Sequence, residues 1–297
     1  MRGLVRDWRG GARARIPDAG WVDELARLWR AYGRLAVPLA IVIITVGIVR
    51  ATLMFAEAAR QPGAIGIDLV TATDAARRWL DGSSPYLARQ LSGPYDLIGA
   101  NTVDSGEMLY PPVALPLFAP FLALPAVLWW AIPGVLCALG LRKARPARAA
   151  WPVIALFLSA GQSIPLIIAG NPTIWVVAGA LWAPSLGWPG PLLLFKPTVA
   201  PLALLGIRRR SWWIAAVLLG IASLGFGSLW ADWFRAIWNM RAPGAGGILY
   251  SVQQLPILLI PVIVAVAARP TATRGAGVLS DPPPPVRGPS APMGTRP

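Results

Sequence analysis

The residues best suited to chemistry lie in one polar segment, residues 56–110, of an otherwise apolar and basic chain. This segment carries more acid than base, with seven Asp or Glu side chains against four Arg. Asp68 stands in it at the start of a helix-like stretch, where backbone N–H groups and the helix dipole favour a carboxylate. From its position alone, the simplest interpretation of such a carboxylate is an N-cap.

Lys196 is the second candidate, because it is the only Lys within an apolar run, PLLLFKPTVAPL. A basic side chain at the centre of a membrane helix costs roughly 2.5–3.5 kcal/mol on insertion scales, and it usually faces a cavity and a partner. Pro197 also breaks the helix at this point. An anionic phosphate is a natural partner, and the alternative is a side chain that extends to the membrane interface.

Other polar residues stand close to the expected membrane surface. Tyr110 precedes two Pro residues where the polar segment returns to apolar sequence, which suits either a helix entry or ligand contact. In a second polar segment, residues 231–254, Arg235 and Arg241 could bind phosphate and Gln253 could contact sugar hydroxyls. Ordinary interfacial positions are the alternative for each of them.

Three further positions have simpler interpretations. Asp74 fits a solvated helix residue, and Asp81 followed by Gly82 predicts the end of that helix, because glycine readily adopts the left-handed turn. The sequence Gly170-Asn171-Pro172 predicts a turn between apolar segments.

Composition excludes several kinds of site. The chain has no His and a single Cys, Cys137, so an internal disulfide, a Cys metal site, His ligands and a Ser-His-Asp triad are excluded. We expect no metal and no cofactor. The net charge of +14 does not indicate nucleic acid, since the basic residues form short clusters beside apolar runs, as in membrane proteins.

The overall class follows from hydropathy. The chain is 56% hydrophobic and 13% charged, with a mean hydropathy of +0.57. Soluble domains carry about 25% charged residues, and several apolar runs here approach the roughly 20 residues that cross a bilayer. We therefore predict an all-α, polytopic membrane helix bundle whose extracytoplasmic first loop contains short helices.

The predicted organisation has three parts. Residues 1–34 form a cytoplasmic segment, disordered at first and then an amphipathic helix at 21–34 that lies on the inner leaflet or packs on the bundle. Residues 35–268 form the transmembrane domain, with the outer loop at 56–110, and residues 269–297 form a disordered Pro-rich tail. No cleavable signal peptide is expected, because the first apolar run begins too far from the N-terminus.

Charge bias places the N-terminus in the cytoplasm, since eight Arg residues precede the first span. Residues 173–207 are too long for one helix, and two helices would place Arg208 outside, so a broken helix or re-entrant hairpin near Lys196-Pro197 is predicted. The other predicted spans are Leu35–Phe55, Pro112–Leu139, Trp151–Ala169, Trp212–Trp230 and Leu255–Ala268. This topology predicts a multi-pass membrane protein with a cytoplasmic N-terminus, and the family resemblance described next implies a bacterial inner membrane.

Several of these residues together resemble a known family. Asp68-Leu69, Ala75, Leu80, Gly82 and Pro85-Tyr86, followed by Tyr110-Pro111-Pro112, resemble the first outer loop of glycosyltransferase family 87 (DUF2029-type, GT-C fold). This group includes polyprenyl-phosphate-mannose-dependent mannosyltransferases. The segments GNPTIWVVAGALW, FKPT and RRRSWW resemble its later Gly-Gln-x-Asn, Lys-Pro and basic segments. The likeness extends from about residue 36 to residue 268.

The resemblance implies an inverting transferase that moves a sugar, mannose in the first instance, from a polyprenyl-phosphate donor to a lipid or glycan acceptor outside the membrane. Asp68 then acts as the catalytic general base, and Lys196, with Arg235 or Arg241, neutralises the donor phosphate. The predicted substrate-binding residues are Lys196, Tyr86, Tyr110, Asp74, Arg235, Arg241 and Gln253.

The sequence departs from the family pattern at some positions. Ala72 stands where an aromatic residue is usual, Asn171 replaces the usual Gln, and the chain is shorter than its relatives. Two alternatives therefore stay open: a non-catalytic, C-terminally shortened relative that acts as an assembly partner, and a transporter of lipids or small molecules. A transporter should line a path with charge, whereas almost all charges here lie outside the predicted spans.

Overall fold

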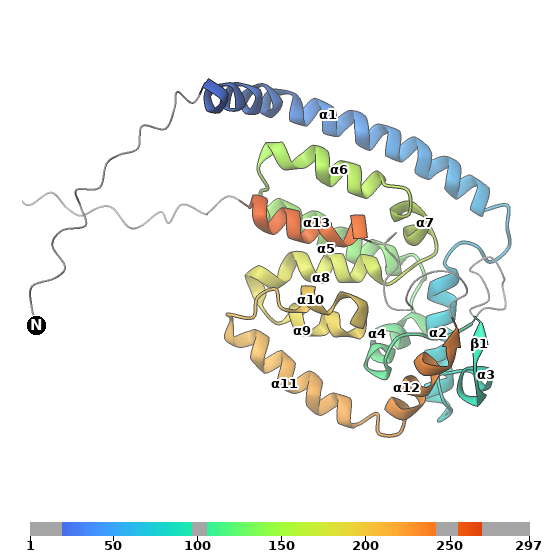
Figure 1. Ribbon diagram of the computed structural model, residues 1–297. Helices are drawn as coiled ribbons and strands as arrows, with labels where there is room; N and C mark the ends of the chain where they lie inside the picture. Colours follow the sequence, from blue (N-terminus) through green and yellow to red (C-terminus); the bar gives the residue numbers. More distant parts are fainter. Residues whose placement is uncertain (1–19, 97–105, 242–254, 269–297) are drawn as a thin grey trace, which may run out of the picture.

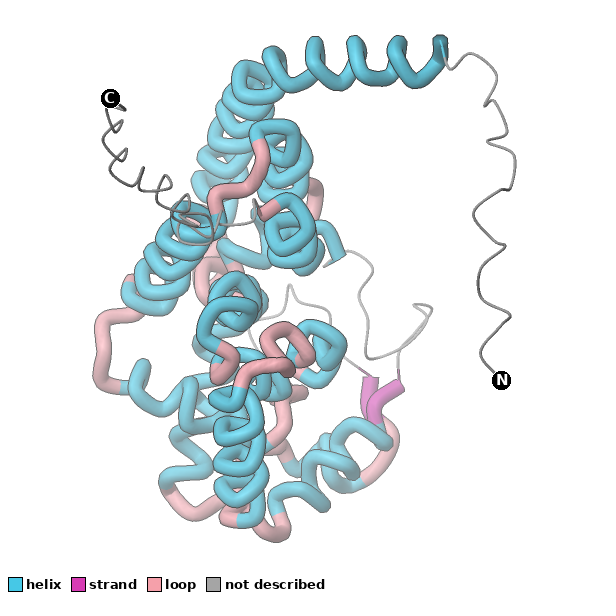
Figure 2. Tube along the Cα trace, turned by 90° about the vertical axis from the view of Figure 1, so that its left-hand side faces the viewer, coloured by secondary structure: helices cyan, strands magenta, loops and turns pink. Residues whose placement is uncertain are grey.

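The computed structural model describes residues 20–96, 106–241 and 255–268, and in these ranges the chain is almost entirely helical (Figures 1 and 2). The predicted disordered ends, Gln253 and parts of both outer loops lie outside the described residues. The predicted α-helical class is confirmed. Helices of the bundle lie side by side, and shorter elements gather at one end of it (Figure 1).

The first helix is the longest. α1 (Gly20–Ala58) runs without interruption through the predicted amphipathic segment and the predicted first span. Its part Ala31–Ala58 is long and apolar enough to cross a membrane. Large apolar side chains along it, such as Leu35, Ile41 and Leu53, are more than half exposed. α1 packs mainly on α6 (Trp151–Ser159), so much of its surface faces away from the protein.

The centre of the bundle is built from apolar helices of moderate length. Besides α6, they are α5 (Leu128–Ala144), α8 (Thr173–Leu186), α11 (Arg210–Leu224) and α13 (Leu255–Ala267). A core cluster forms between α6, α8 and α13, in which Ile154, Val177, Leu181 and Ile260 are buried. α5 contacts α8, and α13 contacts both α6 and α8.

At one end of the bundle, small residues of α2 (Ile67–Leu80) allow close packing of the outer-loop elements. Ala72, Ala75 and Ala76 are fully buried against Phe118 and Trp129. Asp81 ends α2 and Gly82 follows with φ 77°, as predicted. The other elements at this end are α3 (Ala88–Ser92), β1 (Tyr95–Asp96), η1 (Pro112–Ala114), α4 (Leu115–Phe118), η2 (Ala119–Leu122), α12 (Leu229–Asn239) and β2 (Met240–Arg241), with β1 parallel to β2.

Two predicted spans prove to be broken. The run Pro112–Leu139 is not one helix, since η1, α4 and η2 end at Leu122 and α5 begins only at Leu128. The run Trp151–Ala169 is divided into α6 and α7 (Ser163–Ile168), and a short helix, η3 (Arg148–Ala150), precedes it. Proline accounts for both breaks, because Pro125 and Pro165 lack the N–H that would continue a preceding helix and fit the start of a new one.

The interruption predicted at Lys196-Pro197 is confirmed. Lys196 has φ −121° and ψ 87°, which is not helical. It separates α9 (Pro189–Leu192) and η4 (Leu193–Phe195) from η5 (Pro197–Val199) and α10 (Ala200–Ala203). The two arms touch, because a Cβ on Gly190 would lie 2.7 Å from the carbonyl oxygen of Ala203. This segment is a hairpin with Lys196 at its tip.

Both ends of this hairpin lie beside the C-terminus of α8. Arg209 Nε donates to the carbonyl oxygen of Pro184 over 2.8 Å, while Lys196 at the tip reaches Thr173 at the N-terminus of α8. The hairpin therefore enters the bundle and leaves it at the same end. The basic residues Arg208, Arg209 and Arg210 therefore lie at the same end of the bundle as the C-terminus of α8.

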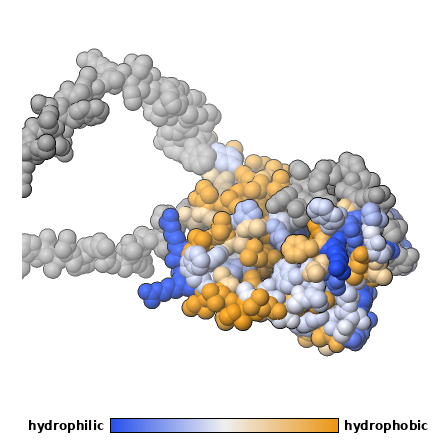
Figure 3. All heavy atoms as spheres, turned by 60° about the horizontal axis from the view of Figure 1, so that its bottom comes forward, coloured by the Kyte–Doolittle hydropathy of each residue, from blue (hydrophilic) through white to orange (hydrophobic). Residues whose placement is uncertain are grey.

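The predicted span Trp212–Trp230 is also corrected, since α11 ends at Leu224 and α12 follows at 91°. α12 is fixed to the outer-loop elements: Trp233 Nε1 donates to the carbonyl oxygen of Leu109 (3.1 Å), and Tyr95 Oη donates to that of Ala236 (2.9 Å). Its outward side carries Trp238, which is 89% exposed. In Figure 3, hydrophobic surface lies across the middle of the molecule, with hydrophilic groups to either side.

Candidate functional site

The backbone around Asp68 is held rigidly against the turn that follows α7. Gly66 caps α2 with φ 75°, and its N–H donates to the carbonyl oxygen of Ile168 (2.9 Å). The N–H of Asp68 donates to the carbonyl oxygen of Ala169 (2.8 Å). No side chain caps α2, so the interpretation of Asp68 as an N-cap is wrong. Its carboxylate is directed to another partner.

The turn that receives α2 is held from its other side by α5. The indole N–H groups of Trp129 and Trp130 donate to the carbonyl oxygens of Gly170 (2.7 Å) and Ile167 (2.6 Å). Gly170 has φ 73°, and a Cβ there would lie 3.2 Å from both Leu69 and Trp130. Two aromatic anchors and one glycine therefore position the residue that follows, Asn171.

Gly170→Ala should destabilise the fold through this turn. A left-handed φ costs an L-residue roughly 1–2 kcal/mol, and crowding against Leu69 and Trp130 adds about 1 kcal/mol or more. Gly82→Ala is the matched control, because Gly82 has φ 77° with open space around it. In a thermal unfolding experiment in detergent, the melting temperature of Gly170→Ala should be lower than that of Gly82→Ala. Equal losses for the two variants would contradict this role of the turn.

Four side chains form one hydrogen-bonded group, which we call the Asp68–Lys196 cluster: Asp68, Asn171, Thr173 and Lys196. Asn171 Nδ2 donates to Asp68 Oδ2 over 2.7 Å. Asn171 Oδ1 accepts from Lys196 Nζ (3.0 Å), from the Thr173 hydroxyl (2.6 Å) and from the Thr173 N–H (3.0 Å). Lys196 Nζ also donates to the Thr173 hydroxyl. The cluster joins α2, the turn before α8 and the tip of the hairpin.

The cluster is largely shielded from water, since Thr173 and Lys196 are buried and Asp68 and Asn171 are partly buried. Lys196 is 4% exposed, and burial raises the pKa of Asp68, although the Asn171 hydrogen bond and the Lys196 charge oppose this rise. A carboxylate with a raised pKa binds a proton more strongly, which is the property that a general base needs. The cluster therefore combines a proton acceptor with a buried cation.

The two predicted tyrosines take different places. The Tyr110 ring lies 5.9 Å from Lys196 Nζ, so Tyr110 belongs beside the cluster. Tyr86 lies behind it, where its hydroxyl donates to the carbonyl oxygen of Tyr110 over 2.9 Å. Both side chains are held in the packed core of the outer-loop elements. Tyr110 can thus contact a ligand at the cluster, whereas Tyr86 supports the backbone of Tyr110.

The structure does not bring the other predicted residues to the cluster. Asp74 lies further along α2, half exposed and 3.5 Å from Arg77. Arg235 on α12 is two-thirds exposed and lies 4.0 Å from Asp232. The side chains of Arg241 and Gln253 lie outside the described residues.

The sequence analysis did not place Asn171 or Thr173 at the site: Asn171 was predicted in a turn and named as a departure from the family pattern, and Thr173 received no role of its own. A signal was present in the sequence: GNPT places an amide and a hydroxyl between two apolar segments. Polar side chains at such a point need partners, because burying them without hydrogen bonds is costly. Their partners, Asp68 and Lys196, are distant in the chain, and the sequence did not indicate the pairing.

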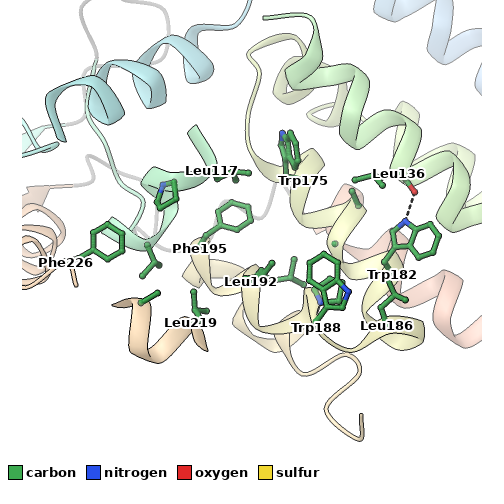
Figure 4. Close-up of a pocket in the computed structure, with 17 residues that line it drawn as sticks. Leu117, Leu136, Trp175, Trp182, Leu186, Trp188, Leu192, Phe195, Leu219 and Phe226 are labelled. Atoms are coloured by element: carbon green, nitrogen blue, oxygen red, sulfur yellow. Dashed lines mark hydrogen bonds between the residues drawn. The ribbon is translucent and has the colours of Figure 1, made fainter. Parts of the chain in front are cut away.

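An apolar cavity of about 700 Å³ adjoins this region (Figure 4). It lies between α8, the hairpin, α11 and the η1–α4 segment. Trp175 and Phe195 line it near the cluster, being close in the chain to Thr173 and Lys196, while Trp188 and Leu186 line the other end. Trp175 Nε1 is a buried donor that has no partner among the described residues.

Within the ranges that the structure describes, no three acidic or Cys side chains gather as metal ligands would. Comparisons with family models, with curated proteins and with solved structures find no match for this chain. The functional interpretation therefore depends on the geometry above.

Proposed function

We propose that this chain is a multi-pass membrane glycosyltransferase of the GT-C type. It transfers a sugar, mannose in the first instance, from a polyprenyl-phosphate donor to a lipid or glycan acceptor on the extracytoplasmic side. The observation that carries the proposal is the Asp68–Lys196 cluster, which joins a shielded carboxylate to a buried cation beside an apolar cavity.

Exposed apolar side chains and the distribution of charged residues along the chain support a multi-pass arrangement. Among the described residues, one helix is long and apolar enough to span a membrane, or two if α11 and α12 count as one bent span. α11 exposes Ile214, Val217 and Leu218 by about 60% each, as a lipid-facing helix would. No Asp or Glu occurs between residues 108 and 231, so the basic clusters at 142–148 and 208–210 are uncompensated. By the loop-charge rule, this basic end faces the cytoplasm and the cluster faces outward.

Cysteine labelling should reveal opposite faces at the two ends. In a Cys137→Ser background, which has no other Cys, Ser83→Cys should react with an impermeant maleimide from outside intact spheroplasts. Arg208→Cys should react only in inverted vesicles, because Ser83 and Arg208 are both exposed but at opposite ends. Reaction of both from the same side would overturn the proposed topology.

The chemistry needs one base. Asp68 accepts the proton of an acceptor hydroxyl while that oxygen attacks the anomeric carbon of the donor sugar. The bond from this carbon to the phosphate oxygen breaks, and the polyprenyl phosphate leaves with the electron pair. Attack opposite the leaving group inverts the anomeric centre. Phosphate needs little acid assistance to leave, so a cation such as Lys196 is sufficient to stabilise its charge.

The cavity supports a lipid-linked donor. Its lining is almost wholly apolar and aromatic, which suits a hydrocarbon chain. A chain lying along it from Trp188 to Trp175 would bring its phosphate to the region of the cluster. The unpaired N–H of Trp175 could then donate to a phosphate oxygen, since an unsatisfied buried donor gains most from a ligand acceptor.

One observation favours a second candidate, a lipid transporter. A buried cation at the tip of an interrupted helix also occurs where transporters bind anionic substrates. A transporter needs no base, so its activity should survive Asp68→Asn. A non-catalytic assembly partner would likewise show no transfer.

The test is sugar transfer by the purified chain in lipid. It would receive radiolabelled polyprenyl-phosphate mannose and a membrane-lipid extract, with Asp68→Asn in parallel. A new labelled product only with the unsubstituted chain supports the proposal. Folded protein that produces no labelled product from this donor, or from the corresponding glucose donor, counts against it.

A further inference from the structure

Asn171 holds the centre of the Asp68–Lys196 cluster. Its amide oxygen accepts from an ammonium, a hydroxyl and a backbone N–H, and its amide nitrogen faces a carboxylate. This pattern fixes the orientation of the amide, because the reversed side chain would point oxygen at the carboxylate and N–H groups at three donors. Both ends of the Asn171 side chain are therefore committed.

The amide also separates two opposite charges. Lys196 Nζ bonds to Asn171 and Thr173, and among the described residues no salt bridge joins it to Asp68. A direct pair would hold the Asp68 carboxylate in its charged form and occupy the oxygens that must accept a proton. With the amide in between, Asp68 Oδ1 has no hydrogen-bond donor among the described residues.

We propose that Asn171 is the positioning residue of this site: it orients the Asp68 carboxylate and prevents Lys196 from pairing with it directly. This role rests on the proposed function in so far as Asp68 is a base. Asn171 itself need not touch the substrate. The geometry that carries the proposal is the pair of hydrogen bonds, 2.7 Å to Asp68 and 3.0 Å from Lys196.

Asn171→Asp removes the hydrogen bond donated to Asp68 and keeps the size of the side chain. The new carboxylate has the same shape and can still accept from the Thr173 N–H at the start of α8, so the turn should be preserved. It cannot donate to Asp68, it adds a negative charge beside Asp68, and it engages the Lys196 charge. The charged or titratable groups that face Asp68 are Lys196 and Tyr110. All three changes raise the pKa of Asp68.

The protonation of Asp68 can be followed without any transfer reaction. Dicyclohexylcarbodiimide adds to protonated carboxyl groups, and mass spectrometry separates the peptide that contains Asp68 from the one that contains residue 171. The full chain in lipid would be labelled across a pH series, with Asp68→Asn as the blank. The half-labelling pH should rise by about one unit or more in Asn171→Asp, and Asn171→Gln, which keeps the amide donor, should remain close to the unsubstituted chain.

An unchanged half-labelling pH in Asn171→Asp would overturn the positioning role, and so would a shift of equal size in Asn171→Gln. If the unsubstituted chain transfers no sugar, only the proposed function fails, because labelling reports the cluster directly. In an active chain, the acid limb of the kcat profile should move to higher pH together with the half-labelling pH in Asn171→Asp. A merely structural role would lower kcat at every pH and leave the acid limb in place.

Discussion

Asp68→Asn should lower the rate of sugar transfer by about 10²–10⁴-fold, which is the usual contribution of a general base. Asparagine has the shape of aspartate, and its oxygen can still accept from Asn171 Nδ2, so the cluster should remain assembled. What is lost is the proton acceptor. Initial rates with labelled polyprenyl-phosphate mannose, measured on folded protein, would give the ratio.

The dependence of kcat on pH should also identify Asp68 as the base. Burial raises the pKa of Asp68 above its ordinary value. A base works only when deprotonated, so kcat should rise with pH through this raised pKa and then level off. The acid limb should therefore lie at a higher pH than an exposed carboxylate would produce. A rate that stays constant down to the ordinary aspartate range would exclude Asp68 as the base.

Asp81→Asn is the matched control for this substitution. Asp81 lies at the other end of α2 and is exposed. Its substitution makes the same chemical change, from a carboxylate to an amide. Its rate and pH profile should equal those of the unsubstituted chain. If both variants lose activity equally, the effect comes from the charge of the outer-loop elements and not from the base.

The fold could be predicted from the sequence where local physics decides it. Helical class, the first span, the end of α2 at Asp81-Gly82 and the interruption at Lys196-Pro197 all follow from apolar length, glycine or proline. The breaks at residues 123–127 and 160–162 were missed, because the apolar run continues through them while the backbone does not. Hydropathy reports what a segment buries, and it does not report where a helix restarts.

The candidate site was predictable only in part. Lys196 was recognised because a lone charge within an apolar run is visible in one sequence. Asp68 was recognised because it stands at the start of a helix-like stretch and matches the first outer loop of the family. Asn171 was not, because its role depends on two partners that are distant in the chain. Arg235 was predicted to bind phosphate because its charge is visible in the sequence. Its exposure and its distance from the cluster depend on the right-angled bend before α12, which the sequence does not indicate.

Lys196→Met should give the second large effect. Methionine fills a similar volume without charge, so the donor phosphate would lose a charge-assisted hydrogen bond in a site shielded from water. Loss of one such group at a developing negative charge costs about 10²–10³-fold in kcat. Loss of the same contact in the ground state would raise the KM for the donor. Steady-state kinetics across donor concentrations would separate the two effects.

The second Lys of the chain provides the control. Lys143 lies at the basic end of the bundle, with its Nζ 4.8 Å from the centre of the Trp182 ring, so both lysines stand near an aromatic face. Lys143→Met removes the same charge from the same chain but away from the cluster. It should leave kcat and KM unchanged.

The two substitutions at the cluster should also be coupled. Lys196 supports the charged form of Asp68, so Lys196→Met should raise the pKa of Asp68 further and move the acid limb to higher pH. In the double variant Asp68→Asn, Lys196→Met, the loss should therefore be smaller than the product of the single losses. Losses that simply multiply would mean that the carboxylate and the ammonium act independently, and the cluster would then be a structural contact between two separate sites.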